Sequence, residues 1–127
     1  MRFRQVVALF FIVGMLLVAT AHTQGIDSTR AAAEQGDPAA QMAMGAFCHH
    51  GMGVPQSDKD AARWYLLAAK QGNAGAQTTV GMMYLSGQGV QKDEAQAKSW
   101  LRKAAEQGDS TAKRQLESMK KPTKDLE

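Results

Sequence analysis

The sequence predicts an all-α protein built of stacked helix pairs, and three observations carry this prediction. A stretch of 36 residues from Gly36 is restated from Gly72 without a gap, with twelve identical positions. Within each copy apolar residues fall at helical spacing, and glycines and capping residues stand at the expected helix ends. A fixed period of this length is typical of solenoids, whose repeats stack on one another. A third copy begins at Gly108 and covers one helix, and a partial copy, residues 31–35, precedes the first.

The first helix of each copy is predicted over residues 38–50 and 74–86. Asp37 and Asn73 can cap these helices, because their side-chain oxygens accept hydrogen bonds from the free N–H groups of the first turn. Glycine-rich turns follow in both copies, and glycine adopts the positive φ that ends a helix. A phosphate-binding loop is the other interpretation of these glycines, but no predicted strand precedes them and no Lys-Ser/Thr pair follows.

The second helix of each copy is predicted to begin at a capping box. Ser57 and Asp93 each have an Asp or Gln three residues later, a spacing typical of this motif. From there the helices are expected to run to Gln71 and Gln107. Apolar residues at positions i, i+3, i+4 and i+7 define one face of each. These faces are Ala61, Trp64, Tyr65 and Ala68, and then Ala97, Trp100, Leu101 and Ala104.

The first helices are expected to pack through a face of small residues. The face recurs at the repeat period in all three copies, and its glycines and alanines let a neighbouring helix approach closely. The opposite face of the last helix is polar, as a terminal capping helix requires. The three packing faces are Ala40, Met44, Gly45 and Cys48; Ala76, Val80, Gly81 and Tyr84; and Ala112, Leu116 and Met119.

The first 21 residues are predicted to be a secretory signal peptide. Arg2 and Arg4 form a basic start, a nearly unbroken apolar run follows, and small residues at 19–21 suit cleavage after Ala21. An uncleaved membrane anchor is the alternative, but the apolar run of 16 residues is shorter than the roughly 20 that a spanning helix needs. We therefore expect a periplasmic or secreted protein that has no membrane contact after cleavage.

The cleaved chain is expected to form one repeat domain with short extensions. Asp27 and Ser28 can cap a short helix that runs to Gln35 and covers the first full repeat. Without Arg2 and Arg4, 13 Lys and Arg stand against 12 Asp and Glu, a net charge of +1, which does not indicate nucleic-acid binding. The expected segments are residues 22–30, a repeat domain at 31–119 with full repeats at 36–71 and 72–107, and a polar tail at 120–127.

These residues resemble the Sel-one-like repeat family, a subclass of the tetratricopeptide-type helical repeats. The family pattern is an alanine, an aliphatic–glycine pair, a tyrosine and a G-x-G-V turn, followed by A-x-x-W and A-A-x-x-G. It occurs twice in register within residues 31–119. Cys48 stands where the family usually has tyrosine, and Leu101 where it often has tyrosine. The resemblance implies a right-handed α-solenoid, commonly exported in bacteria, that binds another protein in a concave groove as a scaffold or adaptor.

In repeats of this kind the first helices line the groove, so partner-binding residues are expected beside the packing face. The neighbouring stripe has small side chains, methionines and a few polar groups, and methionine adapts to the shape of a partner. A plain solvent-facing or packing stripe is the alternative. The candidate groove residues are Met42, Ala46, His49, His50, Thr78, Met82, Leu85, Ser86 and Arg114.

Cys48, His49 and His50 are adjacent, which suggests a metal site as one interpretation. Adjacent helical residues point about 100° apart, so three in a row do not easily share one ion. No carboxylate or second cysteine stands four residues away. A buried cysteine in the place of a tyrosine is the favoured interpretation, and an intermolecular disulfide is the other alternative. The sequence predicts no metal and no cofactor.

The predicted function is protein–protein interaction rather than catalysis. No Gly-x-Ser-x-Gly or His-Glu-x-x-His pattern occurs, and no nucleophile–base pair can be named. Secreted relatives that have been discussed as β-lactam-binding or hydrolysing proteins have paired cysteines in each repeat, so a hydrolase is the lesser alternative. The small size and expected export suggest two partners: a toxin that the protein neutralises as an immunity protein, or a subunit of an envelope complex.

Overall fold

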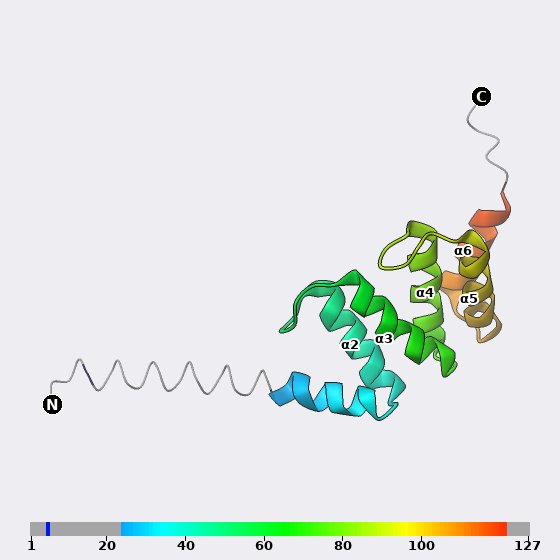
Figure 1. The fold of residues 1–127 in the computed structure, drawn as a ribbon. Coiled ribbons are helices and arrows are strands. Elements are labelled where there is room, and N and C mark those ends of the chain that lie inside the picture. Colours follow the sequence, from blue (N-terminus) through cyan, green and yellow to red (C-terminus); the bar gives the residue numbers. More distant parts are fainter. Residues whose placement is uncertain (1–4, 6–23, 122–127) are drawn as a thin grey trace.

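The computed structural model describes residue 5 and residues 24–121, and residues 24–121 form a row of paired helices (Figure 1). Helices within a repeat pack on each other, and each second helix packs on the first helix of the next repeat. No strand occurs in this part of the chain. Residues 24–34 are helical, and α2 (Pro38–His50), α3 (Asp58–Lys70), α4 (Ala74–Ser86), α5 (Glu94–Glu106) and α6 (Ser110–Lys120) follow.

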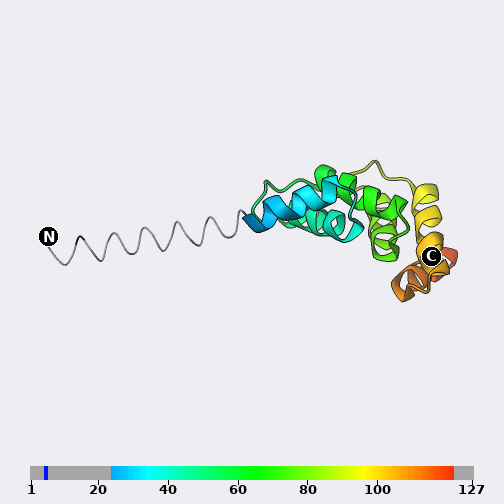
Figure 2. The same cartoon turned by 90° about the horizontal axis from the view of Figure 1, so that it is seen from below.

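The arrangement confirms the predicted all-α, right-handed solenoid with a 36-residue period. The helix at residues 24–34 and α6 lie at opposite ends of the row, with the two full repeats between them (Figure 2). Apart from residue 5, the segment 1–21 of the signal-peptide prediction lies outside the described residues, as does most of the predicted tail. Among the helices that the structure describes, none is long and apolar enough to cross a membrane.

The ends of the first helices follow the predicted capping pattern. The Asp37 carboxylate accepts hydrogen bonds from the N–H groups of Ala39 and Ala40, and Asn73 accepts one from Ala76. Gly51 and Gly87 close these helices with φ of 67° and 74°. A side chain would be strained in this left-handed conformation, so glycine is the residue that suits it.

The second helices begin where predicted, but each capping box forms only half of its bonds. Ser57 accepts a hydrogen bond from the N–H of Asp60, at 3.1 Å. The N–H of Ser57 itself donates to the Cys48 carbonyl oxygen at 2.8 Å, and that of Asp93 to the Tyr84 oxygen at 2.9 Å. These donors are therefore used to tie the turn back to the preceding helix, and no side chain reaches them.

The N-terminal helix begins earlier than its predicted cap. Residues 24–34 are helical, so Asp27 and Ser28 lie inside the helix, and the Ser28 hydroxyl donates to the Gly25 carbonyl. Ile26 is buried, and its side chain occupies the space that a Cβ on Gly53 would need. Packing of this isoleucine against the first repeat explains why the helix extends beyond the local capping signal. Residues 22 and 23 lie outside the described part.

The core consists largely of alanine, because glycines bring the helices of a pair close together. A Cβ on Gly45 would lie 2.5 Å from the Tyr65 ring, and one on Gly81 would lie 2.7 Å from Cγ of Leu101. The predicted packing faces are therefore confirmed where α2 meets α3 and α4 meets α5. The central cluster of buried residues is Cys48, Ala61, Ala62, Tyr65, Ala68, Ala69, Ala76, Val80 and Met83.

Glutamine side chains join each repeat to the preceding helix and connect the two ends of the same repeat. Gln41 Nε2 donates to the Ala33 carbonyl oxygen at 3.1 Å. Gln71 Nε2 donates to Gln41 Oε1 at 2.8 Å and to the Gly36 oxygen at 2.9 Å. The second repeat repeats every bond, with Gln77, Ala69, Gln107 and Gly72 in the same roles. This ladder satisfies the polar groups of side chains that are only 4% exposed at positions 41 and 77.

Candidate interaction surface

A shallow depression lies where the first repeat meets the second. Its volume is about 280 Å³, and its lining is mainly apolar. Residues from α2, α3 and α4 contribute to it, together with the turn after α4. The lining residues are His49, Tyr65, Thr79, Met82, Met83, Ser86 and Gln88.

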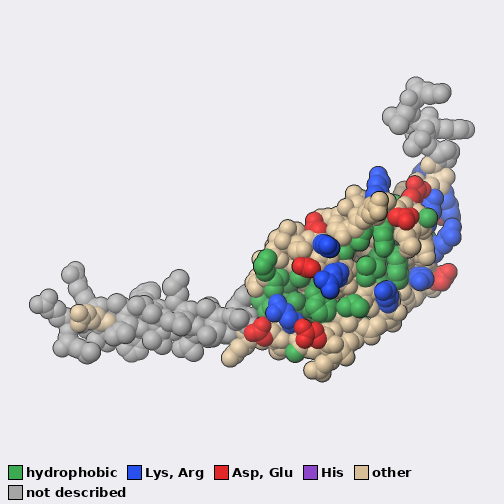
Figure 3. Space-filling view, in the orientation of Figure 1, with side chains coloured by type: hydrophobic (Ala, Val, Ile, Leu, Met, Phe, Trp, Pro, Cys, Tyr) green, Lys and Arg blue, Asp and Glu red, His purple; other side chains and the backbone are tan. Residues whose placement is uncertain are grey.

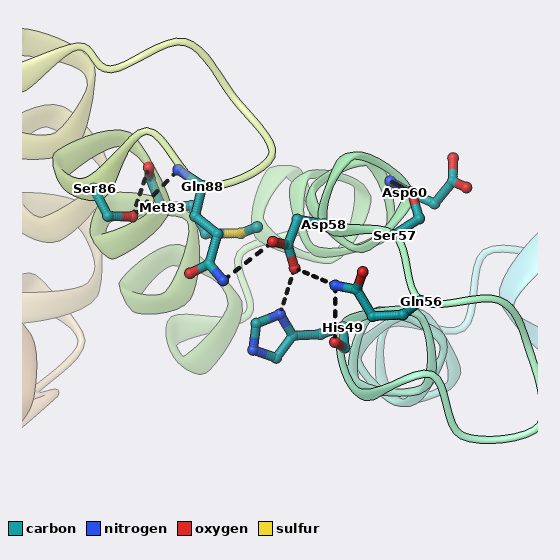
Figure 4. A network of polar contacts seen from close by, with 8 residues as sticks. All are labelled: His49, Gln56, Ser57, Asp58, Asp60, Met83, Ser86 and Gln88. Carbon is teal, nitrogen blue, oxygen red and sulfur yellow. Dashed lines mark hydrogen bonds and ion pairs between the residues drawn. The ribbon is translucent and has the colours of Figure 1, made fainter.

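A polar network holds one rim of this depression (Figure 4). His49 Nδ1 lies 2.9 Å from Asp58 Oδ1, and because an ionised carboxylate only accepts hydrogen bonds, the imidazole N–H donates. Gln88 Nε2 donates to Asp58 Oδ2 at 3.2 Å, which links the turn of the second repeat to the first. Gln56 Nε2 donates to Asp58 Oδ1 at 3.0 Å. The hydrogen bond from His49, followed by those from both glutamines, holds the pKa of Asp58 below its usual range.

Three of the predicted groove residues meet at the depression. His49, Met82 and Ser86 all line it, although they come from different repeats. Met82 is 40% exposed, which is high for a methionine beside a core. The neighbouring His50 is exposed on α2, with its ring edge-on to that of His49. Three residues of the stripe that helical spacing predicts, His49, Met82 and Ser86, therefore lie together at the depression.

The remaining predicted groove residues lie elsewhere. Met42 is partly buried against the central cluster, and Leu85 packs against a separate cluster formed by α5 and α6. Ala46 is partly buried, and Arg114 is exposed on α6. Thr78 is only 8% exposed, so it contributes to the packing below the surface, contrary to the expectation of a groove residue. Its hydroxyl has no hydrogen-bond partner among the described residues.

The structure adds lining residues that helical spacing did not indicate. Tyr65 was expected only in the core, yet its ring also reaches the depression. Gln88 lies in the turn after α4, where the first repeat has the exposed Met52. The change from Met52 to Gln88 between otherwise similar turns was the sequence signal that could have marked Gln88 as a candidate surface residue. It could not show that the Gln88 side chain reaches back to Asp58.

Cys48 is buried, as predicted for a residue in the place of a tyrosine. Burial raises the pKa of its thiol, and the charge of Asp60 raises it further. A raised pKa keeps the sulfur protonated and weakly nucleophilic at neutral pH. No group of three His, Cys, Asp or Glu side chains suited to a metal ion occurs in the described part of the chain.

Two Ser-x-x-Lys spacings occur at α6, one from Ser110 to Lys113 and one from Ser118 to Lys121. All four residues are exposed, and the Ser118 hydroxyl donates to the Gln115 carbonyl oxygen at 2.7 Å. A serine nucleophile needs a base to accept its proton. This hydroxyl donates to a backbone carbonyl instead, so the arrangement does not favour catalysis.

Comparisons with known proteins agree with the repeat architecture. The family model described as Sel1 repeat matches residues 38–73 and 74–109. These bounds have the period found in the sequence and begin two residues after the predicted repeat starts. A search of curated proteins found no match.

Solved structures similar to this chain include a Sel1 repeat protein from Oxalobacter formigenes, with 40% identity and a TM-score of 0.74. Another is c5321, a protective antigen present in uropathogenic Escherichia coli strains that displays an SLR fold, with 37% identity and a TM-score of 0.74. The alignments cover 76% of this chain but only 28% and 21% of those proteins.

A third similar structure is the cysteine-rich protein B of Helicobacter pylori, with 25% identity and a TM-score of 0.69. That alignment covers 72% of this chain and 68% of the other. Sel1 repeat proteins generally mediate protein–protein interaction. The two matched repeats span more than half of the sequence, and the chain belongs to the Sel1 repeat family.

Proposed function

We propose that this chain is an exported protein–protein interaction module that binds a partner segment in the depression between α2 and α4. The observation that supports this best is Met82, a 40% exposed methionine beside Tyr65 and Met83. An apolar floor with a polar rim is the usual anatomy of a protein interface. His49, Ser86 and Gln88 supply that rim.

The size of the depression favours a side chain over a cofactor. A volume of about 280 Å³ lies just below the range of about 300 to 1,000 Å³ that is common for small-molecule sites. An apolar side chain of the partner fits against Met82, and the polar groups at the rim can hydrogen-bond its backbone. Methionine adapts to such an occupant, because its side chain has several rotatable bonds.

Met82→Glu tests this site, with Leu67→Glu as the matched control. Both residues are exposed, at 40% and 44%, but Leu67 lies on α3 and does not line the depression. The immobilised chain and the two variants are incubated with extract of the source cells, and the bound proteins are quantified by mass spectrometry. We expect one partner to be retained by the chain and by Leu67→Glu, and at least tenfold less by Met82→Glu. Equal retention by both variants would contradict the site.

The identity of the retained protein also separates the alternative functions. A toxin would support an immunity or inhibitor role, and subunits of an envelope complex would support a scaffold. Hydrolysis of a chromogenic β-lactam by the purified chain would support the hydrolase instead.

Export is tested separately, because it does not depend on the depression. The proposal expects a mature protein in the periplasm or medium whose N-terminal residue is His22, as determined by N-terminal sequencing. An intact Met1 in a cytoplasmic fraction would contradict export and leave the interaction site untouched.

A further inference from the structure

The α6 end of the row has a second cleft, which is distinct from the depression between α2 and α4. Its volume is about 370 Å³, and it is lined by Lys98, Arg102, Lys113, Leu116, Glu117 and Lys120. The α6 residues of this set stand one repeat period after Gln77, Val80, Gly81 and Tyr84. In the full repeats this face belongs to the contact between a first helix and its own second helix. The cleft therefore lies where a second helix would cover α6.

Charged residues replace the framework residues around this cleft. Lys98 and Arg102 on α5 correspond to Ala62 and Leu66 on α3, which pack in the central cluster. Glu117 takes the place of Gly81, where even a Cβ would lie 2.7 Å from Leu101. A helix packed at the depth of α3 or α5 would collide with the Glu117 side chain. Another standard second helix is therefore a poor occupant of this cleft.

The charges around the cleft are mostly of one sign. Four lining residues are cationic and one is anionic. Lys120 pairs with Glu117 at 2.7 Å, and Lys98 pairs with Glu94 at 2.8 Å. Arg102 and Lys113 form no ion pair with the described residues. Lys and Arg side chains gather along the edge formed by α5 and α6 (Figure 3).

A cap that served only solubility would be expected to mix both signs of charge. A cleft lined mainly by one sign, as here by four cations and one anion, raises the local concentration of ligands of the opposite sign. Leu116 adds an apolar residue to this lining. We propose that the cleft binds an acidic peptide segment of a partner protein, with an apolar side chain on Leu116 and carboxylates at Arg102 and Lys113.

A synthetic peptide tests this assignment independently of the depression. The probe is a fluorescent 12-residue peptide of repeated Glu-Glu-Leu, and its binding to the purified chain is measured by fluorescence anisotropy at low and physiological salt. Arg102→Glu combined with Lys113→Glu is expected to weaken binding more than tenfold. The matched control, Lys59→Glu with Lys70→Glu, makes the same change in net charge at exposed positions of α3. We expect the control to change binding less than twofold.

Two further measurements in the same assay test which site the peptide occupies and whether its leucines contribute to binding. Met82→Glu is expected to bind the peptide normally, which separates this proposal from the first site. Replacing each peptide leucine by serine is expected to weaken binding at least fivefold. Equal weakening by both charge-reversal pairs would overturn the proposal, because only net charge would matter.

Two other outcomes would assign the cleft to a different occupant. At least tenfold tighter binding after deletion of residues 122–127, which include two carboxylates and a leucine, would assign it to the chain's own acidic end. Self-association that disappears in the Arg102 and Lys113 variant would assign it to a second copy. Either result would overturn the assignment to a partner protein. Circular dichroism establishes that every variant is folded.

Discussion

The two full repeats have the same framework but differ beside it. Tyr65 packs over Gly45 in the first repeat, and Leu101 packs over Gly81 in the second. Different side chains thus fill the same close contact between helices. The glutamine bonds to the preceding helix are the same in both, from Gln41 to Ala33 and from Gln77 to Ala69. Identity between the copies therefore marks the residues that hold the repeats together.

The surfaces differ at the end of the first helices. His49 hydrogen-bonds Asp58 at the rim of the depression. One period later, Leu85 packs against the cluster formed by α5 and α6, and Glu94 pairs with Lys98. The first repeat thus has a polar side chain at a position where the second has a partly buried apolar one. The unshared positions are therefore where partner specificity is expected.

The largest expected effect on stability comes from truncating a buried side chain that both helices of a repeat pack around. Leu101 is fully buried, and Leu101→Ala is expected to lower the free energy of unfolding by about 3 kcal/mol, because it leaves a cavity between helices. Leu67→Ala, at an exposed position, is expected to change it by less than about 0.5 kcal/mol. Urea denaturation followed by circular dichroism measures both. Similar losses in the two variants would show that burial does not separate framework from surface.

The glutamine ladder is expected to give the next largest effect, equal in both repeats. Gln77→Ala removes a donor to Ala69 and an acceptor for Gln107. We expect a loss of about 2 kcal/mol, because the change removes two hydrogen bonds of a side chain that is only 4% exposed, each worth a net stabilisation of about 1 kcal/mol. Gln41→Ala should match this value, whereas Gln96→Ala, an exposed control, should have little effect. A difference above about 1 kcal/mol between Gln41→Ala and Gln77→Ala, measured by urea denaturation, would contradict equivalent repeats.

The two framework glycines should respond unequally to alanine. The change gains about 1 kcal/mol of helix propensity, but overpacking costs about 1 to 3 kcal/mol. At Gly81 the new Cβ would meet both Leu101 and the Ala97 carbonyl oxygen, whereas at Gly45 the three nearest atoms all belong to the Tyr65 ring. A backbone oxygen moves less readily than a side chain, so Gly81→Ala should lower the melting temperature more than Gly45→Ala. The reverse order in calorimetry would refute this explanation.

The smallest expected effect concerns the polar contact found only in the first repeat. His49→Leu removes the main cause of the lowered pKa of Asp58, so this pKa should rise toward its ordinary value. A lowered folded pKa adds stability above the unfolded carboxyl pKa, and the gain disappears as pH falls through the folded value. The variant should thus lose less stability than the original chain upon acidification below about pH 4. NMR titration of the Asp58 carboxyl carbon measures the shift.

Glu94 provides the internal control for that titration. Its pKa is lowered mainly by the hydrogen bond from Lys98, which the His49 substitution does not touch. Its titration should therefore be unchanged in His49→Leu. An unchanged pKa of Asp58 in the same spectra would contradict the explanation that the hydrogen bond from His49 lowers this pKa.

The sequence alone determined the repeat period, the helix ranges of the two full repeats and the packing faces. These features depend on local signals, since Asp37 and Gly51 act on the helix that they flank, and helical spacing places Met44 and Gly45 on one face. The cap expected at Asp27 does not form. It was also a local signal, but the packing of Ile26 against Gly53, in the turn after α2, extends the helix beyond it.

The tertiary structure alone decided which side chains meet. Met82 and His49 come together because α4 stacks beside the first repeat, while the same stacking buries Thr78. The bonds from Gln88 to Asp58 and from Gln71 to Gln41 join residues 30 positions apart. Helical periodicity fixes the direction of a side chain from its own helix, but its exposure and partners depend on the helices packed against it.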